Sequence, residues 1–337
     1  MPEPTRKREL GRGERVLPGV WRLRLPLPWP GVPHCNAWAV AAGDGIVLFD
    51  TGMHEPGSFA HLERALAQVN LRVDNVKLLV CTHAHSDHYG QAATIIERTG
   101  CELWMHPNHE HMTKAAQDPD AAMERRIEIA RQSGVPEMPL RAYQESRKGQ
   151  GFGVAGIVHP DRDLLPGVEI QTDLGAFQVV ETPGHAPSHV CLYQEDRRIL
   201  ISGDHLLGRV SLYYDYGYTP DPAGEFLESL NKVEDLDMRL CLAGHARPFT
   251  DVQAHITANR VVVAERLEGC LRVLREHGPI TAFEAVPLVY GEAITPLNAN
   301  WWLSETLCYL QHLEVTGRAV RTPGELEGDP ERWSLAS

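Results

Sequence analysis

The chain has 337 residues, of which 43% are hydrophobic and 23% charged, as is typical of a soluble protein with one large domain and a smaller one. The formal net charge of −13 disfavours a nucleic-acid partner, because phosphate contacts require clustered lysine and arginine. The sequence has no run of about 18 apolar residues, so we expect no transmembrane helix and no membrane partner.

Residues 1–17 are rich in charge and lack the apolar segment of a secretory signal, so we expect a flexible N-terminal arm. The seven cysteines are scattered and never spaced as CxxC, which indicates reduced core residues rather than disulfides or a zinc ribbon. Together these features predict a cytoplasmic protein.

Residues 18–251 are expected to form the main domain, of α/β class. Apolar stretches broken by glycine and proline predict strands over 18–50, and helical spacing predicts a helix over 58–70. The apolar run "VKLLVCTH" predicts a buried strand, followed by a helix that ends at Gly100. Residues 107–165 are polar and mostly helical in pattern, and we interpret them as an inserted cap. Strands are predicted again over 168–202, then a helix near 223–233 and a strand in "MRLCLAGH".

Residues 252–337 differ in character from the main domain. Three amphipathic helical patterns are followed by two short strand patterns around an acidic turn, which predicts a small winged-helix-like domain. The last helical pattern, "NANWWLSETLCYLQHLEVTG", contains no lysine or arginine, so we do not expect it to contact bases or phosphates.

The stretch "CTHAHSDHYG" places His83, His85, Asp87 and His88 within six positions, in a loop between a predicted strand and a predicted helix. Three further groups of ligand type, His185, Asp204 and His245, each follow an apolar strand pattern. Such strand ends can converge on one edge of a sheet sandwich, where α/β proteins often place binding groups. Imidazoles and carboxylates without cysteine suit Zn²⁺, with Fe or Mn as alternatives.

On these residues the chain resembles the metallo-β-lactamase fold superfamily, over roughly residues 20–250. The resemblance implies an αββα sandwich that binds two Zn²⁺ ions, with Asp87 and Asp204 as the residues assigned to catalysis. The implied ligands are His83, His85 and His185 for one ion, Asp87, His88 and His245 for the other, and Asp204 as the bridge. Asp50 in "LFDTG" either caps a turn or orients a metal-bound histidine, and we favour the orienting role.

A two-metal site can hold a hydroxide that attacks a carbonyl near neutral pH. The C-terminal helices resemble the winged-helix tail of a branch close to glyoxalase II. We therefore expect a dinuclear zinc hydrolase of a small-molecule thioester or ester, with a homodimer as a possible assembly. The alternatives are lactone or β-lactam ring opening, a phosphodiesterase or ribonuclease and, least favoured, a binding protein without catalysis.

Several polar residues near these motifs have two interpretations. Tyr213, Tyr214 and the other tyrosines of "YYDYGY" either line the substrate pocket or pack the loop. Arg247 either anchors the substrate or forms a surface ion pair. His205 is expected to pack or to support the site rather than to bind metal. We do not expect the histidine cluster in "HPNHEHM" to be a primary metal site.

Overall fold

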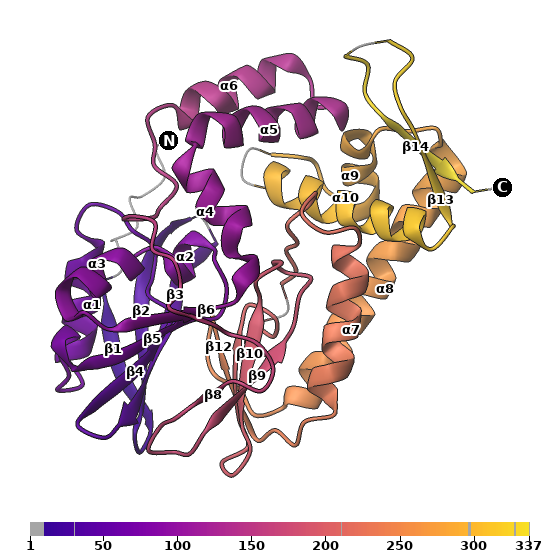
Figure 1. The fold of residues 1–337 in the computed structure, drawn as a ribbon. Helices are drawn as coiled ribbons and strands as arrows, with labels where there is room; N and C mark the ends of the chain where they lie inside the picture. The colour runs from indigo at the N-terminus through magenta and orange to yellow at the C-terminus, as the bar shows by residue number, and fades with distance from the viewer. Residues whose placement is uncertain (1–9, 30, 210, 296–297, 327, 337) are drawn as a thin grey trace, which may run out of the picture.

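Two β-sheets packed face to face form the body of the molecule in the computed structural model, with helices outside each sheet (Figure 1). The structure describes residues 10–29, 31–209, 211–295, 298–326 and 328–336. The helices α1 (Ser58–Ala67) and α3 (Ala92–Thr99) cover the first sheet, and α7 (Pro222–Glu234) and α8 (Val252–His277) cover the second. This layering is the predicted αββα sandwich, so the predicted fold class is confirmed.

The first sheet has seven strands in the order β1-β2-β3-β4-β5-β6-β7. The bounds are β1 (Arg12–Leu17), β2 (Val20–Trp29), β3 (Val32–Ala42), β4 (Gly45–Phe49), β5 (Val76–Cys81), β6 (Glu102–Met105) and β7 (Arg162–Asp163). Strands β1 to β4 pair antiparallel, and β4 to β7 pair parallel.

The second sheet has five strands in the order β12-β11-β10-β9-β8. The bounds are β8 (Glu169–Ile170), β9 (Phe177–Glu181), β10 (Val190–Gln194), β11 (Ile199–Gly203) and β12 (Leu240–Ala243). Only β11 and β12 pair parallel in this sheet.

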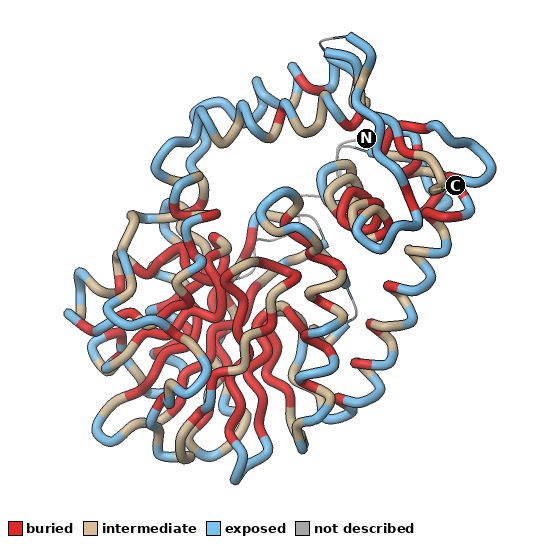
Figure 2. The backbone as a smooth tube through the Cα atoms, turned by 45° about the vertical axis from the view of Figure 1, so that its right-hand side comes forward, coloured by how far each residue is buried: buried red, intermediate tan, exposed pale blue. Residues whose placement is uncertain are grey.

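Three apolar cores fill the three interfaces between the layers. Because side chains alternate along a strand, β3 directs Ala37 and Ala39 to the core under α1, and Trp38 and Val40 to the core between the sheets. Figure 2 shows that buried residues concentrate in the strands of the sandwich. The ends of these strands are therefore held rigidly, which suits a site that needs fixed geometry.

The segment predicted as an inserted cap, which we call the cap, contains α4 (Glu110–Gln117), α5 (Pro119–Gln132) and α6 (Glu137–Arg147), and these helices rise above the sandwich (Figure 1). The end of α5 reaches the C-terminal region, because the amides of Phe283 and Glu331 donate to the carbonyls of Ser133 and Gln132 at 2.9 and 2.8 Å. Arg125 of α5 also donates to the Gly217 carbonyl in the loop after β11, so the cap contacts both the main body and the C-terminal region.

The C-terminal region contains α8, α9 (Ala282–Tyr290), α10 (Ala299–Val315) and a hairpin of β13 (Ala319–Thr322) and β14 (Arg332–Leu335). Thr281 and Glu284 form a reciprocal capping box at the start of α9, and Gly291 ends that helix with a φ of 71°. The predicted helical C-terminal region is therefore present, and its first helix, α8, begins at Val252.

The prediction of a flexible arm over 1–17 is wrong for residues 12–17, which form β1 against β2; residues 1–9 lie outside the described residues. The sequence "RGERVL" shows little apolar alternation, so it gave no strand signal. The backbone of Gly11 and Gly13 lies close to α1. A Cβ at either position would lie 2.0 Å from a backbone oxygen of that helix, so only glycine allows β1 to pack there. Among the described residues, no helix is both long and apolar enough to cross a membrane.

Candidate metal centre

The motif after β5 directs its four side chains in two directions because the backbone changes conformation within it. His85 is extended, with φ −60° and ψ 149°, and caps the short helix α2 (Ser86–Tyr89), which carries Asp87 and His88. His83 and His85 thus leave an extended segment, whereas Asp87 and His88 leave a helical turn. His185, Asp204 and His245 follow β9, β11 and β12 and approach the same edge of the sandwich.

The first group contains three imidazoles, and one nitrogen of each ring is directed at a common point. His83 Nε2 and His185 Nε2 each lie 3.0 Å from His85 Nδ1. The other nitrogen of each ring is a hydrogen-bond donor, because it faces an oxygen. His83 Nδ1 lies 3.0 Å from Thr82 Oγ1, His85 Nε2 lies 2.7 Å from Asp215 Oδ2, and His185 Nδ1 lies 2.9 Å from the Tyr213 carbonyl. When all three rings are neutral, their lone pairs are directed at one point and repel one another, and a cation bound there would remove this repulsion.

The protonation of this group also suits a metal. Burial, followed by the neighbouring histidines, holds the pKa of His83 well below its ordinary value and lowers that of His185 to about 4. Burial also lowers the pKa of His85, but the Asp215 carboxylate more than offsets this, so its pKa is raised. His83 and His185 are neutral at pH 7, as metal ligands must be.

The second group contains Asp87, His88, Asp204 and His245, whose ligand atoms all lie within 4.8 Å of one another. His245 Nε2 lies 3.2 Å from Asp87 Oδ2 and 3.1 Å from Asp204 Oδ2. His88 Nε2 and Asp204 Oδ1 are buried 3.3 Å apart, and neither has a hydrogen-bond partner among the described residues. Two buried polar atoms without partners are costly, and a bound cation would satisfy both.

Asp204 lies between the two groups, since its Oδ2 is 3.8 Å from His185 Nε2 and 3.1 Å from His245 Nε2. A Cβ at Gly244 would lie 2.2 Å from Asp204 Oδ1, so glycine is needed behind this carboxylate. Burial raises the pKa of Asp204, but His245 and His88 more than reverse this and hold it well below its ordinary value. Asp204 is therefore ionised, and its carboxylate lies where it could bind an ion held by either group.

Asp50 holds the second group from behind. Its Oδ2 accepts from His88 Nδ1 at 2.8 Å, and its Oδ1 accepts from the Thr82 amide at 2.8 Å. The Thr82 hydroxyl donates to the same carboxylate and faces His83 Nδ1, so Asp50 also supports the first group indirectly. This is the orienting arrangement that metal-bound histidines usually have.

The sequence matches the model of a known family over most of the sandwich. The match, to the metallo-beta-lactamase superfamily, spans residues 30–245. The chain belongs to this superfamily. Its relatives act as metal-dependent hydrolases, and its His and Asp clusters can hold divalent ions.

Two relatives and one solved structure resemble nearly the whole chain. "Probable metallo-hydrolase YqjP" of Bacillus subtilis is 27% identical, covering 88% of this chain and 92% of its own. "Atrochrysone carboxyl ACP thioesterase" of Aspergillus chevalieri is 24% identical, covering 96% and 88%. A beta-lactamase domain protein from Burkholderia ambifaria has a TM-score of 0.84 at 26% identity, covering 99% of this chain and 97% of its own. The similarity therefore includes the cap and the C-terminal helices as well as the sandwich.

Two residues of this superfamily member's site were missed in the sequence. Asp215, which accepts a hydrogen bond from His85, stands in "YYDYGY" among four tyrosines, and the pattern does not distinguish this carboxylate from an ordinary loop residue. His189 Nε2 accepts from the Asp204 amide at 3.1 Å, while its Nδ1 donates to Thr182 Oγ1 at 2.8 Å. The stretch "GHAPSH" carried a signal for His189, because it ends in a second histidine four residues after His185.

The cluster in "HPNHEHM" lies in the cap, at the start of α4. His106 Nε2 lies 2.9 Å from Glu181 Oε1, and His109 Nδ1 lies 3.2 Å from Thr113 Oγ1, so both have partners away from the two groups. His111 differs, because its Nε2 is 3.6 Å from Asp215 Oδ2. The cap therefore reaches the carboxylate that holds His85, which the sequence did not predict.

The three predicted substrate residues have different positions. The Tyr213 ring lies 6.0 Å from that of His85 and 5.8 Å from that of His185, so it borders the site. The pocket role considered for Tyr214 is wrong, because its side chain is fully buried against Phe226 and Tyr309 in the core beneath α7 and α8. Arg247 is exposed and borders a hollow that is lined mainly by arginines of β1 and β2. His205 is buried against Phe226, in agreement with a packing role.

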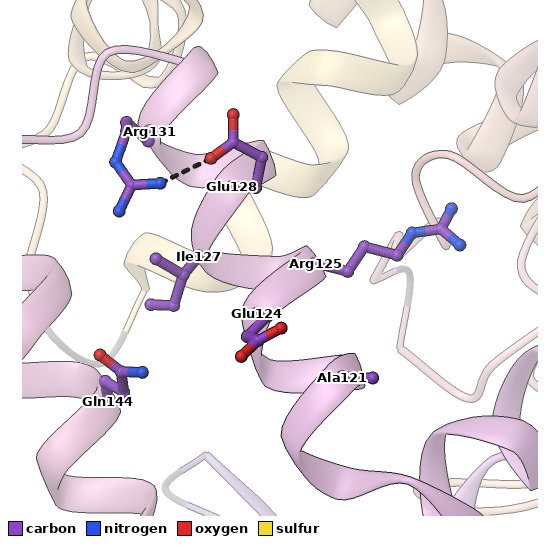
Figure 3. A pocket seen from close by; sticks show the side chains of 7 residues that line it. All are labelled: Ala121, Glu124, Arg125, Ile127, Glu128, Arg131 and Gln144. Atoms are coloured by element: carbon purple, nitrogen blue, oxygen red, sulfur yellow. Dashed lines mark hydrogen bonds and ion pairs between the residues drawn. The ribbon is translucent and has the colours of Figure 1, made fainter. Parts of the chain in front are cut away.

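A hollow of about 460 Å³ on the cap is separate from the metal centre (Figure 3). It lies between α5 and α6 and is lined by Ala121, Glu124, Arg125, Ile127, Glu128, Arg131 and Gln144. None of these residues belongs to either ligand group, and Arg131 and Glu128 form an ion pair with each other along α5 at 2.5 Å (Figure 3). This hollow is therefore separate from the two ligand groups.

Proposed function

We propose that this protein is a dinuclear zinc-dependent hydrolase of a thioester or ester. The observation that carries the proposal is the convergence of histidine nitrogens and carboxylate oxygens on two adjacent points, with Asp204 between them. Two of these atoms, His88 Nε2 and Asp204 Oδ1, are buried without a hydrogen-bond partner among the described residues. His83, His85 and His185 would hold one Zn²⁺, Asp87, His88 and His245 the other, and Asp204 would bridge them. Histidine and carboxylate ligands without cysteine fit Zn²⁺, and they also admit Fe or Mn.

Such ions supply an activated water and polarise a substrate carbonyl when they are bound. The chain provides the rest of the site. Asp50 and Asp215 hold His88 Nδ1 and His85 Nε2 by hydrogen bonds, so the other nitrogen of each ring would be available to an ion bound by its group. Tyr213 borders the first group and lies 6.4 Å from Trp301 of α10, ring to ring, which extends the wall of the site toward the C-terminal region.

Three points support a thioester substrate over a β-lactam. A thiolate leaves without a proton, whereas an amine requires a general acid. The cap and α10 flank the site and suit an extended substrate. The likeness to a protein named as an acyl carrier protein thioesterase supports the same choice. A cytoplasmic location, no nucleic-acid partner and a winged-helix-like C-terminal domain are further parts of the proposal.

A substrate panel on zinc-loaded protein tests the proposal. We expect S-lactoylglutathione or an acyl-coenzyme A to be cleaved at least about tenfold faster than nitrocefin in kcat/KM, which corresponds to about 1.4 kcal/mol. A homoserine lactone and a phosphodiester complete the panel, and Asp204→Asn serves as the inactive control. Faster cleavage of nitrocefin, the lactone or the phosphodiester would replace the thioester with that bond class.

A further inference from the structure

A second hollow, of about 360 Å³, lies beside the second ligand group and is dominated by arginine. It is formed by β1, β2 and the loop after β12. Its lining residues are Arg12, Glu14, Arg22, Arg24, Arg247 and Pro248. Four guanidinium groups and one carboxylate meet here in a chain whose net charge is −13, so the local charge opposes that of the whole protein.

The strand register creates this concentration of positive charge. Arg12 of β1 stands directly opposite Arg24 of β2, and Glu14 stands opposite Arg22. These positions differ by two along each strand, so all four side chains lie on one face of the sheet. The register therefore brings the guanidinium groups of Arg12, Arg22 and Arg24 to the same side of the sheet, where they line the hollow.

Arg22 forms the fixed wall of the hollow. Its side chain is only 4% exposed, its Nε donates to Asn36 Oδ1 at 2.8 Å, and its Nη1 donates to Glu14 Oε1 at 2.9 Å. Its Nη2 donates to the Ala246 carbonyl. Glu14 is thus engaged by Arg22, while Arg12 and Arg247 are exposed at the rim and can turn toward a ligand.

The hollow is joined to the metal centre through His34 and the loop after β12. His34 Nε2 lies 3.2 Å from Arg22 Nη2, and the His34 carbonyl accepts from His245 Nδ1 at 3.0 Å. Arg247 follows the predicted ligand His245 by two positions. A substrate with its reacting carbonyl at the metal centre therefore passes close to these arginines if its remaining part extends on this side.

We propose that this arginine hollow binds the phosphate of the thiol part of the substrate. The inference rests on the proposed thioesterase function and narrows it to thioesters of a phosphate-bearing thiol. Several guanidinium groups arranged around one hollow match the many acceptor oxygens of a phosphate, which arginine binds in bidentate fashion. Coenzyme A and the phosphopantetheine arm of a carrier protein share this chemistry.

Binding of the thiol part alone tests the hollow without hydrolysis. We expect zinc-loaded protein to bind 4′-phosphopantetheine at least about tenfold more tightly than pantetheine in titration calorimetry. The double variant Arg12→Gln/Arg247→Gln should abolish this difference and leave pantetheine binding unchanged. Both residues are exposed, so folding is not at risk, and Arg22 is left intact. Arg72→Gln/Arg141→Gln changes two arginines whose side chains are 77% and 78% exposed elsewhere and should retain the difference.

Kinetics with acetyl-coenzyme A, an acetylated carrier protein and acetyl-pantetheine separate this inference from the proposed function. The double variant should raise KM at least about tenfold for the phosphate-bearing thioesters and leave that for acetyl-pantetheine unchanged. The larger increase identifies coenzyme A or the carrier protein as the source of the phosphate. If the unmodified protein bound 4′-phosphopantetheine and pantetheine equally well, the phosphate-binding role of the hollow would be rejected, even if thioesters are cleaved. An arginine-dependent preference for 4′-phosphopantetheine without any thioester cleavage would support the hollow and reject the thioesterase function.

Discussion

Replacing Asp50 by asparagine isolates the role of its negative charge in metal binding. Asp50 has a φ of 64°, in the left-handed region that asparagine also tolerates, so the variant retains its backbone. The carboxylate has two acceptor oxygens opposite two N–H donors, those of His88 Nδ1 and the Thr82 amide. Asparagine has one acceptor oxygen, so its NH₂ group must oppose one donor whichever way it turns.

The expected loss follows from these contacts. A hydrogen bond to a charged group contributes about 1.5–3 kcal/mol, and the site is almost fully buried. Partners of metal-bound histidines typically contribute about 10–100-fold in affinity. Asp50→Asn should therefore weaken the second Zn²⁺ about 10–100-fold, because His88 belongs to that group. The first ion should be weakened less, because Asp50 reaches His83 only through Thr82.

Competition with a chromophoric chelator measures both zinc affinities. Asp173→Asn is a matched control, since the Asp173 carboxylate also accepts from a backbone amide, that of Gly43 at 2.8 Å, but is exposed. It should leave both affinities unchanged. If Asp50→Asn changed neither affinity by more than about twofold, or weakened the first ion more than the second, the orienting role of Asp50 would be refuted.

Three further predictions concern metal, protons and nucleic acid. Asp204→Ala should remove the second ion and reduce turnover at least about 100-fold, whereas His109→Ala should keep the metal content, as elemental analysis can check; the reverse result would contradict the assignment. Burial lowers the pKa of His245, but the Asp204 and Asp87 carboxylates more than offset this and raise its pKa to about 10. Burial likewise lowers the pKa of His88, and the same two carboxylates raise that pKa well above its ordinary value. Both rings therefore carry protons at pH 7 without metal. Zinc binding should release about one to two protons per chain at pH 7, and fewer as pH rises through 10, by calorimetry in buffers of different ionisation enthalpy; no release would contradict this. Fluorescence anisotropy should detect no sub-micromolar binding of DNA or RNA at physiological salt, since the chain is acidic; tight binding would favour a ribonuclease.

The sandwich and the ligand groups could be predicted because their signals are local. Each ligand follows an apolar strand pattern, and neighbouring strand ends meet at one edge of a sheet. Strand β1 could not be predicted in this way, because it depends on the approach of Gly11 and Gly13 to α1, a contact about 50 residues away in sequence. Tyr214 was equally ambiguous, since an aromatic beside a site has the same sequence signal whether it faces the pocket or the core.

Asp215 shows why the supporting residues were harder to predict than the ligands. Its role depends on three segments that meet only in the folded chain. Its amide donates to the His185 carbonyl at 3.2 Å, its carboxylate holds His85, and His111 of the cap lies 3.6 Å from the same oxygen. No spacing within the sequence reports such an arrangement.

The same segment joins the metal centre to the C-terminal region. Ser304 of α10 donates to the carbonyl of Tyr214, the residue before Asp215, at 2.7 Å. The Tyr213 carbonyl holds His185 in turn. Residues 213–215 are therefore fixed on one side by two ligands of the first group and on the other by α10, with the cap at His111. Because a histidine ligand keeps its orientation only while its partner does, the geometry of the first group depends on the cap and on α10 as well as on the strands that carry the ligands.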